Sequence, residues 1–393
     1  MNTILTPTAV TREALVVLHQ KLSFIGSINR QYDDSFAKDG AKIGDSLKIR
    51  LPNEYVVRNG ITMAAQDTTE SSTTLQVQTV KGVDLNFTSQ ELTLSLQDFS
   101  DRIIEPAMSV LAANIEADAL SMSLDVYQVV NNIGSALAMR PALQARKVLT
   151  DALAPGSKRN LQLNTQDNLD FVDSVKGLFQ AGDTIAKQYR EGKVGSTAGF
   201  GDIYENTLIA SQQTGTAAAA TGYTVNGASQ TGSGVVVATG TATFKRGDVV
   251  TLGINRVHPE TKIDTGNLQT FVVTADYAGG AGTLPISPAI VTSGGRQNVT
   301  GSPANGAAVT KIGAASSIYR PSLAYHENAF TFATADLVQP KGVDFAAREV
   351  MDGISMSMVR QFQISDRSFP CRLDVLYGFK TIRPQLATRI LSN

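Results

Sequence analysis

Residues 106–130 read PAMSVLAANIEADALSMSLDVYQVV and carry the clearest helical pattern in the chain. Apolar side chains recur on one face at steps of three, four or seven: Met108, Leu111, Ile115, Met122, Val126 and Val129. Proline is tolerated in a first helical turn, so the helix is predicted to begin at Pro106 and to end before Asn131-Asn132 and Gly134. A helix over all of this segment would be a rod of roughly 37 Å.

Shorter elements follow this helix. Pro141 in a first turn and Pro155-Gly156 as a terminator bound a second helix over residues 141–153. Further elements are predicted in the order strand 161–163, helix 168–179, helix 183–190 and strand 201–210. Helices and strands that mix without a repeating strand–helix–strand rhythm favour an α+β fold over a doubly wound sheet.

Upstream, residues 46–87 predict two strands joined by a long polar connection. Apolar and polar residues alternate in both strands, with the apolar positions at Leu47, Ile49, Leu51, Leu75 and Val77. A connection as long as 53–74 is uncommon inside a compact domain and indicates a loop that is functional or ordered by a partner. Three of its charged residues, Arg58, Asp67 and Glu70, are the candidate contacts to an adjacent subunit, and a disordered tip is the alternative.

Near the N-terminus, residues 12–22 predict an amphipathic helix, because Leu15, Leu18 and Leu22 fall at helical spacing. This helix is either a short arm that packs on a partner or an ordinary helix of its own domain. The apolar run from Ala14 to Leu18 is too short for an export signal.

The composition changes over residues 211–313. This segment holds 17 of the 33 glycines but only ten charged residues. Short runs rich in β-branched residues, at 234–238, 248–252 and 270–274, are separated by glycine-rich turns, which is typical of a small β-barrel or sandwich. Because mixed sequence resumes after Ser317, we interpret 211–313 as an inserted all-β domain. Alternating patterns at 351–364 and 373–377 then predict further strands.

Composition also argues against several classes of protein. The 34 Lys+Arg and 35 Asp+Glu residues give a net charge of -1, whereas a dedicated nucleic-acid binder is normally strongly basic. A run of ~18 apolar residues would be needed to predict a membrane span, and the chain has none. The single cysteine, Cys371, cannot form an internal disulfide, which suits a reducing cytoplasm, and we expect a buried thiol.

Motifs for metal or catalytic chemistry are missing from the sequence. His19, His258 and His326 lie far apart, with no cysteine or histidine at metal-ligand spacing, so no metal and no cofactor is expected. The patterns HExxH, GxSxG, CxxC and GxxxxGK[ST] do not occur. The sequence therefore gives no support to an enzyme. One triplet, Arg246-Gly247-Asp248, matches an adhesion motif, but a β-turn with glycine at its special φ position explains it more simply.

In this order, the segments resemble the coat proteins of short-tailed phages, which carry an insertion domain within the HK97 capsid fold. Individual stretches that are similar to that family are LQVQTVKGVDLNF from Leu75, LAANIEA from Leu111, FKRGDVVTL from Phe244, PCRL from Pro370, LYG from Leu376 and Arg383-Pro384. The resemblance spans nearly the whole chain, and its collinear order is more specific than any one stretch. Such a resemblance is an analogy of fold.

The resemblance implies an α+β capsid fold of HK97 type with an inserted all-β, barrel-like domain. The expected divisions are an N-terminal arm at 1–45, an extended β-loop at 46–87, the spine helix and α+β body at 88–210, the inserted β-domain at 211–313, and the returning body with C-terminal strands at 314–393. The long helix would brace the subunit core, and the arm would move during shell maturation.

The implied function is that of a major capsid protein, which self-assembles as hexamers and pentamers into an icosahedral shell around the phage genome. Implied partners are a scaffolding protein, a portal and weakly contacted double-stranded DNA, with no membrane, in a virion assembled in the bacterial cytoplasm. Two alternatives remain: the shell of an encapsulin-like protein compartment, and a β-rich phage or tail surface adhesin. The helical first half of the chain counts against the adhesin.

Overall fold

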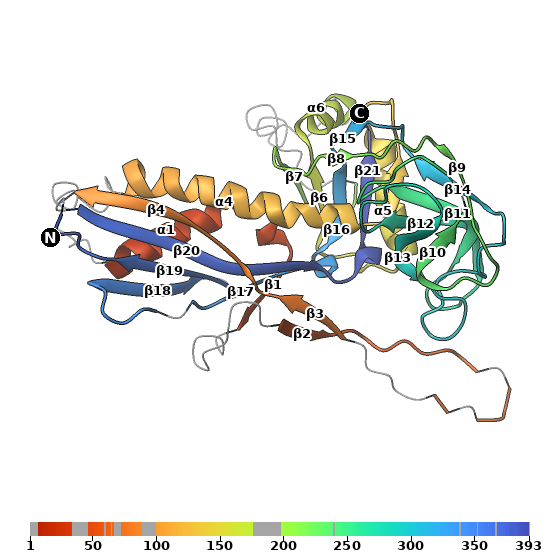
Figure 1. The fold of residues 1–393 in the computed structure, drawn as a ribbon, viewed down its shortest axis with the longest axis horizontal. Coiled ribbons are helices and arrows are strands. Elements are labelled where there is room, and N and C mark those ends of the chain that lie inside the picture. The colour runs from red at the N-terminus through yellow and green to blue at the C-terminus, as the bar shows by residue number, and fades with distance from the viewer. Residues whose placement is uncertain are drawn as a thin grey trace. The chain divides into compact units, whose positions relative to one another are not determined.

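The computed structural model describes residues 7–33, 46–58, 60–63, 65–66, 72–88, 100–175, 198–238, 240–337, 339–351, 353–365 and 368–392. Contacts along the chain define two compact units (Figure 1). Unit 1 is built from Met1–Arg50, Ser72–Leu120 and Phe330–Ile382. Unit 2 is built from Leu51–Ser71, Ser121–Ala329 and Arg383–Asn393.

Unit 1 is organised on a six-stranded sheet whose longest member is β20 (Figure 1). The order β1-β17-β20-β19-β18 is joined by β4, which also pairs with β20. The strands are β1 (Asn29–Asp33), β4 (Thr79–Thr88), β17 (Phe330–Ala335), β18 (Phe345–Met351), β19 (Ile354–Arg360) and β20 (Ser368–Thr381). A separate hairpin pairs β2 (Ser46–Arg50) with β3 (Ser72–Gln76). All of these pairings are antiparallel except β1 with β17.

The strands predicted from alternation at 351–364 and 373–377 are confirmed as β19 and β20. Leu373, Val375 and Tyr377 share one face of β20 and are buried, and Asp374 and Leu376 on the opposite face are buried too. The hairpin strands predicted near 46–51 and 75–78 are also present, and Leu75 is fully buried.

The buried thiol of Cys371 lies in β20, opposite Leu85 of β4 and Arg360 of β19. Burial raises the pKa of this thiol to about 12, so it stays protonated and unreactive at neutral pH. We expect a maleimide to label native subunits at pH 8 at least ~100-fold more slowly than unfolded chains, because the thiolate fraction falls with each unit of pKa. Mass spectrometry of timed reactions measures this rate, and equal rates in the two states would contradict it.

The long helix α4 spans Glu105–Leu120 and follows a π-helical turn, Ser100–Ile104. Its face of buried residues includes the predicted Met108, Leu111 and Ile115. Asp118 connects the helix to the sheet. Its carboxylate accepts a hydrogen bond from Tyr377 of β20 at 2.5 Å and forms an ion pair with Lys81 of β4 at 2.7 Å.

The predicted end of this helix at Val130 is wrong. After Leu120 the chain forms a 3-10 turn, Ser121–Asp125, and then the strand β5 (Val129–Asn131). Serine side chains compete for backbone hydrogen bonds and weaken a helix interior, while valine and tyrosine fit a strand. The apolar spacing of the sequence persists through this turn, which explains why it predicted a longer helix.

The N-terminal helix α1 (Pro7–Lys21) packs on α4, β18 and β19 within unit 1. Leu15, Leu18 and Leu22 are buried, as their spacing predicted. Of the two interpretations of this segment, the structure shows an ordinary helix of its own unit. That residues 1–45 act as an arm stays a prediction.

The first part of unit 2 is a five-stranded sheet with the order β5-β21-β16-β6-β7. Besides β5, its strands are β6 (Arg159–Leu163), β7 (Asp202–Glu205), β16 (Ser322–His326) and β21 (Ala387–Leu391). The predicted helices at 141–153 and 168–179 correspond to α5 (Met139–Asp151) and α6 (Thr165–Val175). The helix predicted at 183–190 lies outside the described residues.

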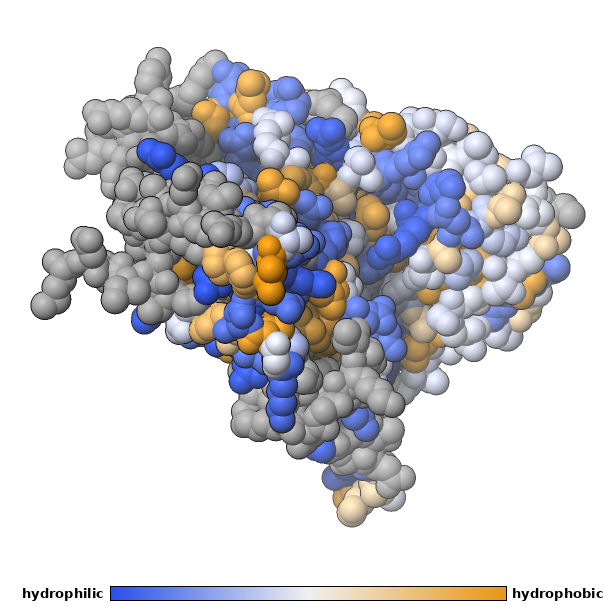
Figure 2. Space-filling model, turned by 60° about the vertical axis from the view of Figure 1, so that its left-hand side comes forward, coloured by the Kyte–Doolittle hydropathy of each residue, from blue (hydrophilic) through white to orange (hydrophobic). Residues whose placement is uncertain are grey.

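The second part of unit 2 is a six-stranded sheet whose strands all lie between β7 and β16 in the sequence, and we call it the β-insert. Its order is β10-β13-β12-β11-β14-β9, with β9 (Ala220–Thr224), β10 (Gly232–Val237), β11 (Val249–Val257), β12 (Asp264–Val273), β13 (Gly282–Ile290) and β14 (Ala308–Ile312). The strands enclose an apolar core of their own, which includes Tyr223, Phe244 and Phe271. Figure 2 shows a largely pale surface over the insert, at the right, as its glycine- and threonine-rich composition implies.

The chain enters and leaves the β-insert through two paired strands of two residues each. In this neck, β8 (Gln212–Gln213) runs antiparallel to β15 (Ile318–Tyr319). Thr214 continues the pairing, since its amide donates to the Ser317 carbonyl at 2.8 Å and its hydroxyl accepts the Ser317 amide at 2.9 Å. The neck therefore joins the insert to the five-stranded sheet through few backbone bonds.

Candidate functional site

The extended loop between β2 and β3 is organised by side chains that bond to its own backbone. Gln66 joins the two limbs of the loop, because its side chain accepts from the Val56 amide at 2.9 Å and donates to the Val56 carbonyl at 2.5 Å. Arg58 closes the tip by donating to the carbonyls of Gly60 at 2.5 Å and Thr62 at 2.9 Å. Among the three predicted contact residues, Arg58 thus shapes its own loop, while Asp67 and Glu70 lie outside the described residues.

The same loop exposes apolar side chains that the sequence analysis did not single out. Val57, Ile61 and Met63 are 84%, 99% and 80% exposed. Neighbouring apolar side chains that are left exposed in the subunit are candidates for burial against another molecule. Nothing in the sequence distinguished them, because apolar residues are ordinarily expected to be buried.

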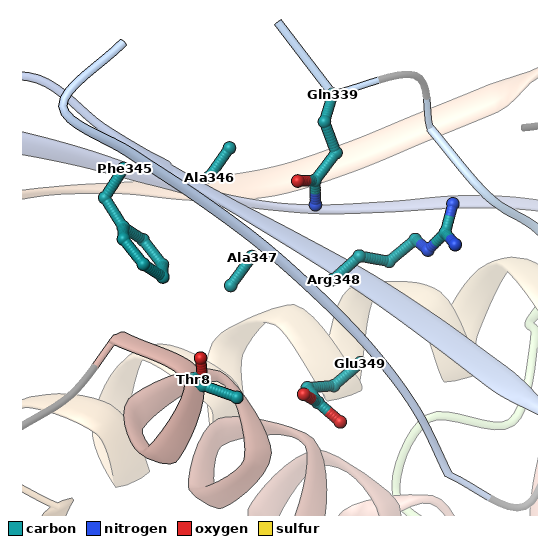
Figure 3. Close-up of a pocket in the computed structure, with 7 residues that line it drawn as sticks. All are labelled: Thr8, Gln339, Phe345, Ala346, Ala347, Arg348 and Glu349. Carbon is teal, nitrogen blue, oxygen red and sulfur yellow. The ribbon is translucent and has the colours of Figure 1, made fainter. Parts of the chain in front are cut away.

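A groove of about 640 Å³ lies in unit 1 between α1 and β18 (Figure 3). Its lining residues are Thr8, Gln339, Phe345, Ala346, Ala347, Arg348 and Glu349. Arg348 is paired with the buried carboxylate of Asp336 at 3.0 Å, so its charge is already compensated. Thr8 and Glu349 supply no nucleophile with an adjacent histidine, and the groove does not have the arrangement of a hydrolase site.

The two histidines whose side chains are described serve the backbone. Nδ1 of His258 accepts the amides of Glu260 and Thr261 at 3.3 Å in the turn between β11 and β12. Nδ1 of His326, a buried residue, accepts the amide of Asn328 at 3.2 Å, and burial lowers the pKa of this imidazole. Within the described ranges no three metal-ligating side chains gather at one place. No described helix is long and apolar enough to cross a membrane.

The triplet Arg246-Gly247-Asp248 forms the predicted turn, with Gly247 at φ +94°. Neither charged residue of the triplet is available to bind a receptor as an adhesion motif would. Arg246 pairs with Asp125 at 2.7 Å, and Asp248 is fully buried. The turn therefore faces its own subunit.

An α+β chain with an extended loop, a long braced helix and a separate β-insert has the features of a shell subunit, and it lacks a recognisable catalytic site in the residues that are described. A sequence model of the family described as "P22 coat protein - gene protein 5" matches residues 28–390. The chain belongs to this P22 coat protein family.

Solved structures resemble this chain over most of its length at low identity. A Mycobacterium phage Che8 structure is 14% identical, with a TM-score of 0.45, over 94% of this chain and 90% of that one. The "asymmetric unit of bacteriophage PhiM1 mature capsid" is 11% identical, with a TM-score of 0.46, over 95% and 87%. A virus-like particle from Pyrococcus furiosus is 8% identical, with a TM-score of 0.37, over 97% of each chain. Comparison with curated protein sequences gives no match.

Membership of the family confirms the predicted fold class and function. The fold is an α+β capsid fold of HK97 type with an inserted β-domain. The protein is a major capsid protein, a structural protein of the virion that self-assembles into the phage shell. This identification decides against the compartment shell and the adhesin.

Proposed function

We propose that the protein acts in the shell as a purely structural subunit, without a catalytic step of its own, and that it assembles in the host cytoplasm as hexamers and pentamers. The match of the coat protein family to residues 28–390 carries this proposal. A scaffolding protein and a portal are the proposed partners in assembly. Packaged DNA would be contacted weakly, because a net charge of -1 offers little attraction to phosphates.

The extended loop is the proposed contact to a neighbouring copy. The contact would combine the apolar side chains of Val57, Ile61 and Met63 with the polar residues Arg58, Asp67 and Glu70. Burying one exposed isoleucine against a neighbour contributes ~1.5–3 kcal/mol, more than a surface ion pair at ~0–1 kcal/mol. The apolar side chains would therefore supply most of the affinity, and the internal bonds of Arg58 would hold the loop in a shape that presents them.

The Ile61→Asp variant tests this contact. We expect at least a tenfold lower yield of shells from expressed protein, because a charge would replace an apolar side chain in each repeated contact. Electron microscopy and sedimentation of particles, with any scaffold partner present, measure the yield. The thermal midpoint of the free subunit should not change, since Ile61 is 99% exposed.

Ile61→Leu is the matched control, because it keeps the apolar area, and it should assemble normally. A normal yield of shells from Ile61→Asp would refute the apolar contact.

The segment 211–313 is proposed to act as an inserted domain that stabilises its subunit or contacts neighbours. Support for the stabilising role comes from an apolar cluster shared with the body of unit 2. Tyr127 is buried in it beside Val249 and Val272 of the β-insert, with Val129 and Ile312 packed against them. Apolar area buried at this seam contributes to folding at ~25 cal/mol per Å².

A further inference from the structure

A buried polar network lies beside this apolar seam, and the turn at Gly247 is at its centre. The guanidinium of Arg389, on the last strand β21, donates to Oε1 of Gln212 at 2.7 Å and to the Gly247 carbonyl at 2.9 Å. Gln212 in turn donates to the same Gly247 carbonyl at 2.7 Å. One carbonyl of the insert is therefore held by both a neck strand and the C-terminal strand.

The neighbouring Asp248 extends the network into the neck. Its Oδ2 accepts the amides of Gly215 at 3.0 Å and Lys245 at 2.9 Å. From the other side, Nζ of the buried Lys311 donates to the carbonyls of Gly215 at 3.2 Å and Ala314 at 3.1 Å. Both chain segments of the neck are thus bonded to charged groups of the insert.

Arg389 is the only arginine among the fully buried large side chains of the described residues. Burial lowers the pKa of its guanidinium to about 10, while Asp125 and Asp248 oppose this change, so it remains charged at neutral pH. A buried charge is costly to desolvate, and replacing a whole buried polar network by apolar groups of similar volume is often neutral or stabilising. The stability of the fold therefore does not by itself explain an arginine at this position.

Directional bonds supply that explanation. The β-insert has its own core and is joined to the body by a short neck, so apolar contact at the seam would tolerate several orientations of the insert. Hydrogen bonds of fixed geometry are satisfied in one orientation only, and leaving buried acceptors unsatisfied penalises the others. We propose that Arg389, through Gln212 and the Gly247 turn, is a latch that sets the orientation of the β-insert on the five-stranded sheet of unit 2.

Spin labels on both sides of the seam test the latch in the free full-length subunit. The exposed positions Leu169 in α6 and Ile263 at the β11–β12 turn are changed to cysteine and labelled, while the buried Cys371 does not react. Pulsed electron paramagnetic resonance spectroscopy then measures the distribution of distances between the labels. We expect a narrow distribution for the parent, and at least a doubling of its width in the Arg389→Met variant.

A second variant separates orientation from stability. Arg389→Met combined with Gln212→Leu replaces the polar pair by apolar groups. We expect it to recover part of the thermal midpoint that Arg389→Met loses, while its distance distribution stays broad because the Gly247 carbonyl still lacks both donors. Arg389→Lys, which keeps the charge and one of the two bonds, should broaden the distribution by an intermediate amount and carries the test if Arg389→Met does not fold.

Arg159→Met is the matched control, because Arg159 is a buried arginine of the body whose bonds go to Thr150, Ala154 and Pro155. It should lower the thermal midpoint without broadening the distribution. A narrow distribution in Arg389→Met, or equal broadening in Arg159→Met, would overturn the latch.

Discussion

Replacing Gly378 by alanine is expected to destabilise unit 1 by ~3 kcal/mol or more, a large part of the ~5–15 kcal/mol that stabilises a typical domain. Gly378 lies in β20 opposite Ala333. It contacts Gln76 and Val77, at the point where the chain passes from β3 to β4. A Cβ at Gly378 would stand 2.1 Å from the Gln76 carbonyl oxygen and 3.0 Å from Cα of Val77. Both obstacles are backbone atoms, so no side-chain rotation can relieve the overlap, and the crossing strands would have to separate.

Two measurements test the expected loss of stability in Gly378→Ala. Thermal unfolding gives the change in midpoint, and the rate at which maleimide reaches Cys371, seven residues away in the same strand, reports opening of the sheet itself. The rate should rise by at least tenfold. Gly156→Ala is the control, because nothing lies within 4 Å of its Cβ position. It should change stability by less than ~1 kcal/mol. A Gly378→Ala subunit with the parent's midpoint would show that Gln76 and Val77 are not in close contact with Gly378.

Several strands of this fold were predictable from the sequence, because apolar and polar residues alternate along them. Alternation at Ile354, Met356 and Met358 predicted β19, because polar Ser355 and Ser357 interrupt the apolar residues with a period of two. The pairing of β1 with β17, which lie some three hundred residues apart, leaves no local pattern. Neighbours in a sheet are set by tertiary packing, and a single sequence does not encode them at fixed spacing.

The candidate site was only partly predictable for a related reason. A long polar loop was identified, and Arg58 with it, because charged side chains stand out in composition. The exposed Val57 and Ile61 were overlooked, since apolar residues are expected to be buried and only the structure shows which of them are not. The role of Arg389 was not predictable either. Its sequence neighbours Ala387, Thr388 and Ile390 give no sign that the charge is buried, and its acceptor Gln212 lies 177 positions away in the sequence.

The second large effect concerns Glu116, which the helical pattern of α4 places beside the apolar face rather than on it. The residue is nonetheless 2% exposed. Its Oε1 accepts hydrogen bonds from the Ser23 amide at 3.2 Å, the Ser23 hydroxyl at 2.6 Å and the Phe24 amide at 2.9 Å. The carboxylate thereby fixes the turn that follows α1, and Phe24 packs edge-on against Phe330 of β17 with ring centres 5.6 Å apart.

We expect Glu116→Ala to cost ~3–5 kcal/mol, because it removes the acceptor that one buried and two partly buried donors share, and each bond to a charged group is worth ~1.5–3 kcal/mol before non-additivity. Glu116→Gln keeps an acceptor oxygen of the same shape and should cost about 1 kcal/mol. Denaturant unfolding measures both values.

Glu105→Ala is the control, because it tests whether removing any contact between α1 and α4 lowers the free energy of unfolding by the same amount. Glu105 also joins the two helices, through Lys21 at 3.2 Å, but the two side chains are 49% and 43% exposed, so the pair is worth only ~0–1 kcal/mol. If Glu116→Ala unfolds at the same denaturant concentration as Glu105→Ala, the buried anchor is not what holds the N-terminal helix. If the expected difference is found, the bonds to Glu116 are what hold the turn after α1 against α4. A rearrangement of the N-terminal segment during shell maturation would then either involve only residues that precede Pro7 in the sequence, or break the bonds to Glu116. If these bonds can break, trypsin should cleave at Lys21 faster in Glu116→Ala than in the parent.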